Sequence, residues 1–186
     1  MPAAALKALT ERLEHAQVFL EYGSGGSTVL AAKMGVGTIV SVESSVDWVD
    51  SVRSAASHHA GTLHLLLADI GKTGDWGRPV DRKAVERWHL YPEIGWRRLR
   101  ELGLSPDVVL IDGRFRVACF CVSLLSSNPG TVLLFDDYVD RKQYHVVEEF
   151  CQRTSLHDRM AEFRVPERMD AGAVVACLLA HVHEAD

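Results

Sequence analysis

The sequence predicts an α/β fold in which a doubly wound, mostly parallel seven-stranded sheet carries helices on both faces and ends in a C-terminal antiparallel hairpin. Short apolar runs alternate with helix-compatible segments five times, and strands without polar alternation are typical of a parallel sheet buried on both faces. A glycine-rich turn follows the first run, as in nucleotide-binding strand–turn–helix corners. The last two strand-like runs are too close in sequence for a crossover helix, which predicts the hairpin.

The elements follow in chain order. In the N-terminal segment 1–16, an amphipathic helix is expected over residues 3–16, with Leu6, Leu9 and Leu13 on one face. The β-then-α units that follow comprise strands at 18–22, 38–42, 64–68, 107–111 and 131–135 and helices at 27–34, 47–56, 93–102, 117–126 and 141–153. The hairpin strands are expected near 160–165 and 173–180. The irregular segment 71–92 is interpreted as a lid or substrate insertion; the alternative is an aromatic cluster that pins a loop onto the domain.

Composition narrows the function classes. The 186 residues are most simply one domain, 1–186, with 47% hydrophobic and 24% charged residues. A net charge of -5 argues against nucleic-acid and anionic-membrane partners, and no apolar run approaches the roughly 20 residues that span a bilayer. Four cysteines without a Cys-x-x-Cys spacing indicate reduced thiols and a cytoplasmic location.

The glycine-rich turn is the first candidate binding feature. Gly23, Gly25 and Gly26 let the backbone approach a ligand closely, with Ser24 between them. The following helix offers unpaired N–H groups at its start, near Ser27. Such turns also serve as plain connectors, so the interpretation depends on what the other strands carry.

An acidic residue stands at the end of each of the five parallel strands: Glu21, Glu43, Asp69, Asp112 and the pair Asp136–Asp137. Ligands of open α/β sheets bind at this edge, although an acid there is also a common helix cap. Glu43 lies 20 residues after Gly23, the spacing at which a carboxylate accepts hydrogen bonds from ribose hydroxyls. Asp69 followed by Ile70 offers an acceptor and an apolar face, which suits adenine.

With these motifs the chain resembles the class I S-adenosylmethionine-dependent methyltransferases, which have a Rossmann-like fold, from Val18 through the hairpin. The family's acid-x-Gly-x-Gly motif matches Glu21 to Gly25, and Ser27 replaces a third glycine. The resemblance implies that Glu21 and residues 23–26 hold the methionine part of S-adenosylmethionine, that Glu43 binds ribose, and that Asp69 with Ile70 binds adenine. It also implies that Asp112 faces the reactive methyl group.

Asp112, Asp136 and Asp137 are candidate metal ligands. Three converging carboxylates repel one another unless they are protonated, hydrogen-bonded or bridged by a cation, and an all-oxygen set suits Mg²⁺ or another divalent cation. The arrangement resembles that of metal-dependent O-methyltransferases, which use the metal to bind and acidify a vicinal diol. The plainer interpretation is a loop start with a helix cap.

The catalytic base is less clearly marked. The catechol-type enzymes carry a lysine after the fourth-strand acid, whereas this chain has Arg114 and Arg116 there, and arginine does not deprotonate usefully. Arginines at this point suit recognition of a carboxylate or phosphate, or simply solvate a helix start. His145 is the candidate base beside Asp112, although a helical histidine is more often structural.

The leading hypothesis is therefore S-adenosylmethionine-dependent O-methylation of a small-molecule acceptor, with a divalent metal as an option. The alternative is a catalytically silent S-adenosylmethionine- or S-adenosylhomocysteine-binding module, favoured by the missing lysine and the short N-terminal region. A nicotinamide-dependent oxidoreductase is weakened by the terminal hairpin and by the lack of a Tyr-x-x-x-Lys pair. The short N-terminal region, which leaves little chain to cover a substrate, also suggests a homodimer in which a second subunit completes the pocket.

Overall fold

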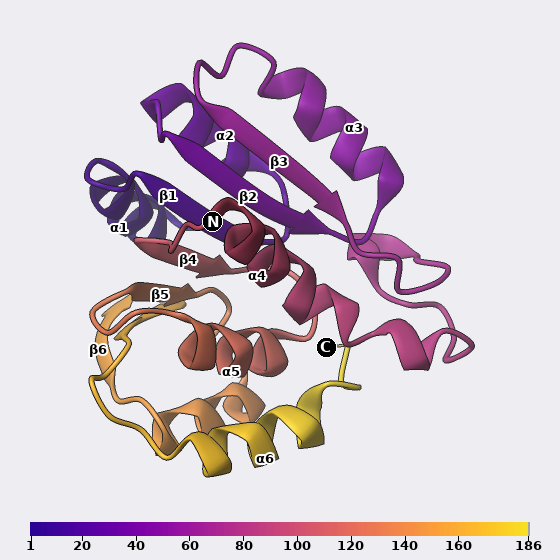
Figure 1. Cartoon of the computed structure of the whole chain (residues 1–186), viewed down its shortest axis with the longest axis vertical. Helices are drawn as coiled ribbons and strands as arrows, with labels where there is room; N and C mark the ends of the chain where they lie inside the picture. Colours follow the sequence, from indigo (N-terminus) through magenta and orange to yellow (C-terminus); the bar gives the residue numbers. More distant parts are fainter. Residues whose placement is uncertain (186) are drawn as a thin grey trace.

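The computed structural model describes residues 1–185 and contains a seven-stranded sheet with the strand order β3-β2-β1-β4-β5-β7-β6 (Figure 1). The strands are β1 (Val18–Tyr22), β2 (Thr38–Glu43), β3 (Thr62–Leu67), β4 (Val108–Ile111), β5 (Val132–Phe135), β6 (Arg153–His157) and β7 (Met160–Arg164). β1 to β5 are parallel, and β7 pairs antiparallel with both β5 and β6. The predicted fold class is confirmed.

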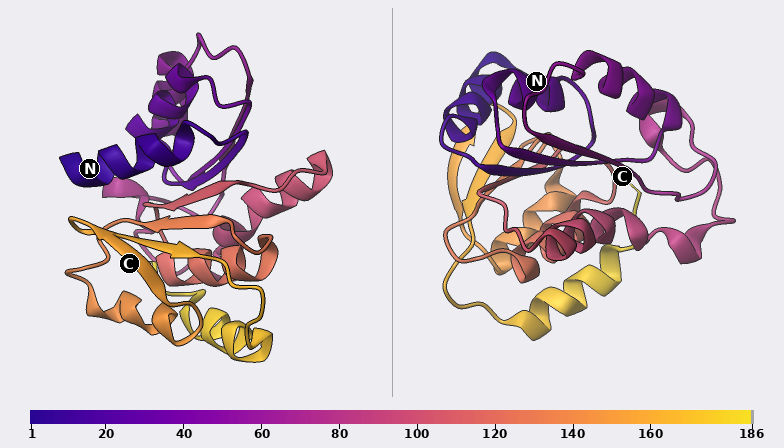
Figure 2. Two further views of the ribbon diagram at one scale, coloured as in Figure 1. Left: turned by 90° about the vertical axis from the view of Figure 1, so that its left-hand side faces the viewer. Right: turned by 45° about the horizontal axis from the view of Figure 1, so that its top comes forward.

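Helices cover both faces of the sheet, as Figure 2 shows. The α-helices are α1 (Ala3–Leu13), α2 (Gly26–Met34), α3 (Val46–Ala55), α4 (Leu90–Leu102), α5 (Arg116–Ser126) and α6 (Ala171–His181). Alternate strand residues point to opposite faces, so Phe19 packs with α1 and α2, whereas Leu20 packs in the core formed with α4, α5 and α6. The parallel strands β1, β2, β4 and β5 are buried on both sides, which explains their continuous apolar sequences, whereas β3 at the sheet edge is partly exposed.

The hairpin exists, but one of its predicted strands was wrong. The second strand was placed at 173–180, whereas residues 171–181 form α6, which packs on α5. Short apolar runs do not distinguish a buried strand from a buried helix, and this one is rich in alanine, the best helix former, with Asp170 as its side-chain N-cap. The hairpin partner of β7 is β6, whose mostly polar sequence RTSLH suits an exposed edge strand.

The predicted helix over 141–153 was also wrong in type and extent. Residues Lys142–Glu149 form a 3-10 run, and β6 already begins at Arg153. The remaining boundaries shift by up to three residues, as at α1, which ends at Leu13 rather than at residue 16, and at α4, which begins at Leu90 rather than at residue 93.

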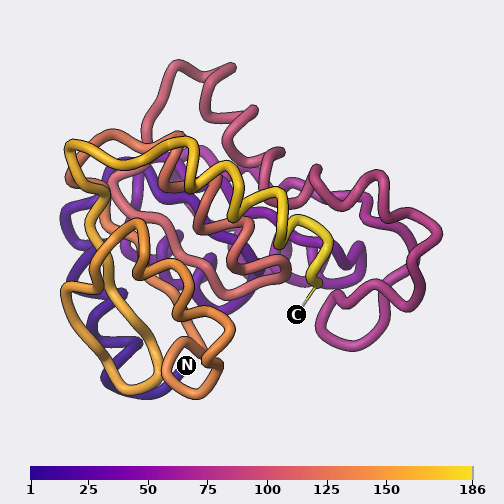
Figure 3. Tube along the Cα trace, turned by 90° about the horizontal axis from the view of Figure 1, so that it is seen from below, coloured from indigo at the N-terminus to yellow at the C-terminus, as the bar shows by residue number. Residues whose placement is uncertain are grey.

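The segment between β3 and α4 projects from the body of the molecule (Figure 3). It contains two short 3-10 turns, Asp75–Gly77 and Val85–Arg87, and no strand of the main sheet. Within residues 1–185, no helix combines the length and apolarity that crossing a membrane would require.

Candidate functional site

The glycine-rich turn is held by the acid that precedes it. Glu21 is fully buried, and its two carboxylate oxygens accept hydrogen bonds from Ser27 Oγ, at 2.5 Å, and from Thr28 Oγ1. Thr28 Oγ1 in turn accepts from the backbone N–H of Gly25 at 2.9 Å. Gly23 has φ +91°, and a Cβ there would lie 2.9 Å from the backbone of Asp112 and Gly113. Glu21 therefore holds the glycine-rich turn in place through Ser27 and Thr28.

Burial dominates the ionisation of Glu21. It raises the pKa of the carboxyl from 4.5 to about 7, against hydrogen bonds from Ser27 and Thr28 that lower it. The unfolded chain then loses this proton before the folded chain does, so the contribution of Glu21 to stability is full below pH 4.5 and is lost as the pH rises to about 7.

The Glu21→Gln variant tests this linkage. Glutamine does not titrate, so the difference in unfolding free energy between the parent and the variant is expected to fall by about 3 kcal/mol from pH 4.5 to pH 7. Urea unfolding across this range measures the difference. Parallel curves for the two proteins would contradict the assignment.

Glu43, the last residue of β2, reaches the same site. It is 7% exposed, and its Oε1 accepts hydrogen bonds from the backbone N–H groups of Ser44, at 2.7 Å, and Ser45, at 3.0 Å. Burial raises its pKa, although these backbone donors oppose the rise. Ser24 Oγ pairs with Ser41 Oγ at 2.6 Å, which ties the glycine turn to β2 beside Glu43.

One cavity of about 1350 Å³ joins most of the predicted site. Its walls include the following predicted site residues: Gly23, Ser24, Gly25, Gly26, Ser27, Glu43, Asp112 and Asp137. Glu21 and Asp136 are fully buried beside it. This volume exceeds the roughly 300–1,000 Å³ of most ligand pockets and leaves room for a cofactor together with an acceptor.

Three predicted site residues lie outside the cavity. Asp69 is exposed; its Oδ1 accepts from the N–H of Gly71 at 3.1 Å and its Oδ2 pairs with Arg87. Ile70 is buried in the core instead. His145 stacks on Tyr138, its Nε2 lies 3.1 Å from the Tyr138 carbonyl oxygen, and it does not line the cavity.

The three aspartates do converge, as predicted, with carboxylate oxygens within 4.8 Å of one another. Three arginines compensate their charge. Arg159 binds both oxygens of Asp136, at 3.1 and 2.7 Å, and lies 3.0 Å from Asp137. Arg116, which is 3% exposed, pairs with Asp112 at 3.3 Å and Asp137 at 3.1 Å, and Arg141 adds a contact to Asp137 at 3.3 Å. We call these six residues the Asp–Arg cluster.

The Asp–Arg cluster shifts the pKa values of Asp112 and Asp136 in opposite directions. Burial and the neighbouring Asp136 raise the pKa of Asp112, Arg116 opposes both, and the resulting pKa is about 7. Burial also acts to raise the pKa of Asp136, but the hydrogen bonds and charge of Arg159 outweigh it and hold that pKa below its ordinary value. Asp136 is therefore the permanent anion, and Asp112 is the group that exchanges a proton near neutrality.

These contacts do not fit a divalent metal. The oxygen donors are of the right type, but the guanidinium groups of Arg116, Arg141 and Arg159 already supply three positive charges to the three carboxylates. A metal ion would have to displace them and would sit among like charges. The cavity does fit S-adenosylmethionine, because its walls combine the glycine turn with the carboxylates of Glu43 and Asp112.

Sequence reasoning missed Arg141 and Arg159, which complete the Asp–Arg cluster. Arg159 lies in the turn between β6 and β7, and the misplaced hairpin hid its position. Arg141 is four residues after Asp137, a spacing that was a usable signal. Trp48 was missed too: its ring N–H donates to the carbonyl of Ser24, and the side chain lines the cavity.

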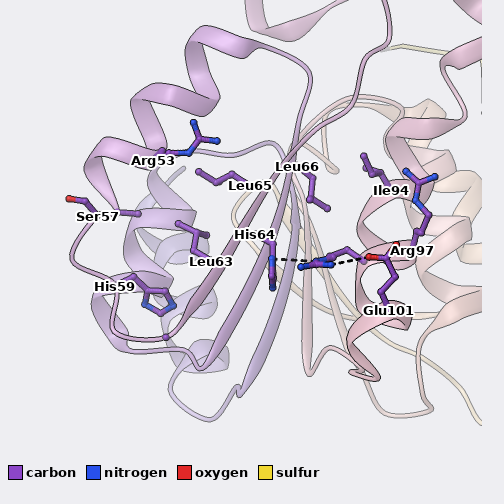
Figure 4. A pocket seen from close by; sticks show the side chains of 13 residues that line it. Arg53, Ser57, His59, Leu63, His64, Leu65, Leu66, Ile94, Arg97 and Glu101 are labelled. Atoms are coloured by element: carbon purple, nitrogen blue, oxygen red, sulfur yellow. Dashed lines mark hydrogen bonds and ion pairs between the residues drawn. The ribbon is translucent and has the colours of Figure 1, made fainter.

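A second cavity, of about 640 Å³, lies at the sheet edge between α3, β3 and α4 (Figure 4). There Arg98 donates to His64 Nδ1 at 3.4 Å and to Glu101 at 3.0 Å. Burial and the charge of Arg98 lower the pKa of His64. This cavity has no glycine turn and lies away from the carboxyl ends of the strands, so the larger cavity is the better candidate site.

Comparisons with solved structures identify proteins with a similar fold. The chain is 39% identical to a methyltransferase-like protein from Silicibacter pomeroyi DSS-3, with a TM-score of 0.88, over 99% of this chain and 96% of that chain. An O-methyltransferase from Bacillus cereus, in complex with S-adenosylhomocysteine, is 18% identical with a TM-score of 0.54, over 88% and 80% of the two chains. An N-methyltransferase from Bradyrhizobium japonicum, also in complex with S-adenosylhomocysteine, is 11% identical with a TM-score of 0.55, over 89% of each chain. These two more distant likenesses show the fold alone. No protein-family model and no curated protein matches the chain.

Proposed function

The chain belongs to the family of the Silicibacter methyltransferase-like protein, with the class I S-adenosylmethionine-dependent methyltransferase fold, and from this premise we propose that it methylates a hydroxyl group of a small molecule. One observation carries the proposal: the glycine turn, Glu43 and Asp112 come from three neighbouring strands and line one cavity. The bound cofactor would supply an electrophilic methyl group on a sulfonium, from which the neutral thioether S-adenosylhomocysteine is a good leaving group.

The residues of this chain then have distinct tasks. The backbone at Gly23 to Gly26 holds the amino-acid end of the cofactor, and Glu43 accepts hydrogen bonds from the ribose hydroxyls. Asp112 orients the acceptor hydroxyl and takes its proton as the new oxygen–carbon bond forms. Arg116 and Arg159 keep the neighbouring carboxylates compensated while Asp112 changes its charge.

Cofactor binding is the first test. Calorimetry with S-adenosylhomocysteine is expected to give a micromolar dissociation constant for the parent and at least about tenfold weaker binding for Glu43→Ala, because the ribose loses its charged acceptor. Glu101→Ala, in the second cavity, is the matched control and keeps the parent affinity. Equal binding by all three proteins would remove Glu43 from the site.

Metal independence is the second test. Treatment with EDTA followed by assay is expected to leave turnover within about twofold, because the Asp–Arg cluster already carries its own cations. Activity that disappears with EDTA and returns with Mg²⁺ would restore the metal-dependent hypothesis.

The silent binding module is the second candidate function. It is favoured by one observation: no lysine or histidine in residues 1–185 lines the cavity. A screen of catechols, hydroxy acids and sugars for methyl transfer separates the two functions. Binding of S-adenosylhomocysteine without any turnover across this screen would favour the silent module.

A further inference from the structure

The cofactor's nucleobase lacks the partners that the sequence assigned to it. Both carboxylate oxygens of Asp69 are engaged, one by the N–H of Gly71 and the other by Arg87, and Ile70 is only 1% exposed. Neither side chain lines the cavity that contains Glu43. A base attached to a ribose at Glu43 must therefore contact other residues.

A short loop, Gly74 to Arg78, lies directly beside Glu43. Ser44 Oγ donates to the carbonyl of Gly77 at 2.9 Å, and a Cβ at Gly77 would lie 3.1 Å from Glu43 Oε1. The loop is closed by hydrogen bonds from the N–H of Gly74 to the carbonyl of Arg78, at 2.8 Å, and from the N–H of Gly77 to the carbonyl of Gly74, at 3.1 Å. Backbone hydrogen bonds thus fix the shape of the loop, and the Ser44 hydroxyl fixes its place beside Glu43.

Trp76, in the middle of this loop, lines the cavity with its side chain 86% exposed. Its φ of +59° is uncommon for a bulky residue and costs conformational energy. The exposed indole recovers little of that energy by packing, so its position requires another explanation. A ring held ready at a cavity wall is the feature on which a planar base stacks.

We propose that the loop Gly74 to Arg78 forms the nucleobase subsite of the cofactor, with Trp76 as the stacking surface in place of Asp69 and Ile70. This inference rests on the proposed cofactor binding. Trp76 is a positioning residue: it fixes the adenine, and through the ribose at Glu43 it fixes the direction in which the rest of the cofactor enters the cavity. Trp48 has a different task, because its ring N–H is bonded to the glycine turn.

Three variants test the subsite by calorimetry with S-adenosylhomocysteine and with adenosine as a competing ligand. Trp76→Ala is expected to weaken both ligands by about tenfold or more and by the same factor, since they share only the nucleoside. Trp76→Phe is expected to restore most of the affinity. Asp69→Ala is expected to stay within about twofold of the parent.

The outcomes separate this inference from the proposed function. Thermal melting checks that Trp76→Ala is folded, which is expected for a side chain with so little packing. Parent-like binding by a folded Trp76→Ala, or a loss confined to Asp69→Ala, would overturn the subsite while leaving the cofactor proposal intact. Absence of S-adenosylhomocysteine binding by the parent would instead overturn the proposed function, and the subsite with it.

Discussion

Asp112→Asn is expected to lower methyl transfer by at least about 100-fold while leaving S-adenosylhomocysteine binding within about threefold. Asparagine keeps the size of the side chain and an oxygen for Arg116, but it cannot accept the acceptor's proton, and general-base catalysis contributes roughly 10²–10⁴-fold. Asp112 lies at the end of β4, lines the cavity and is about one-third exposed, so an acceptor can reach it. Initial rates at saturating cofactor measure the loss.

The pH dependence gives the same assignment a second test. The base must be ionised to act, so the parent's kcat/KM is expected to rise with pH through the Asp112 pKa of about 7 and then level off. Asp50→Asn, which removes an exposed acid that pairs with Arg53, is the control and keeps both rate and profile. A residual Asp112→Asn activity with the parent's pH profile would assign the proton transfer to another group.

Gly23→Ala is expected to lower the unfolding free energy by about 3 kcal/mol and the melting temperature by roughly 10 °C, with loss of measurable S-adenosylhomocysteine binding. The added Cβ would lie 2.9 Å from the backbone at Asp112 and Gly113, and φ +91° strains any side chain. Relief of this contact has to move β1 and β4 apart at the mouth of the cavity, because the two strands are hydrogen-bonded neighbours.

Gly26→Ala is the matched stability control for this prediction. A Cβ at Gly26 meets no atom within 4 Å, and the residue begins α2 without a positive φ. Its melting temperature is expected to equal that of the parent or exceed it slightly, because alanine is the better helix former. Equal destabilisation by the two substitutions would show that the close approach of the strands is not what requires glycine at position 23.

The sequence predicted the carboxyl-end edge of the sheet well, for a physical reason. Parallel strands all end at the same edge, so an acid placed after each strand reaches the same region whatever the exact boundaries. Glu43 and Asp112 reach the cavity in this way, and Glu21 supports the turn that lines it. This prediction therefore depends only on the type and the order of the strands, and the sequence indicates both clearly for β1 to β5.

The sequence and the structure differ where a local pattern does not determine tertiary placement. The apolar run at 171–181 satisfies strand and helix patterns alike, and only its packing on α5 distinguishes them. Asp69 has the expected position after β3, but Arg87, 18 residues later, binds it outside the cavity. Arg159, in the turn between β6 and β7, binds Asp136 at the end of β5, and this long-range contact cannot be predicted from spacing in the sequence.

The Asp–Arg cluster has a consequence for how the site is assembled. A metal ion dissociates, so a metal-dependent site is filled only to the extent that its affinity and the supply of the ion allow. Guanidinium groups belong to the chain and keep their charge at every pH that a protein meets. The cationic positions of the cluster are therefore occupied in every folded molecule at any dilution.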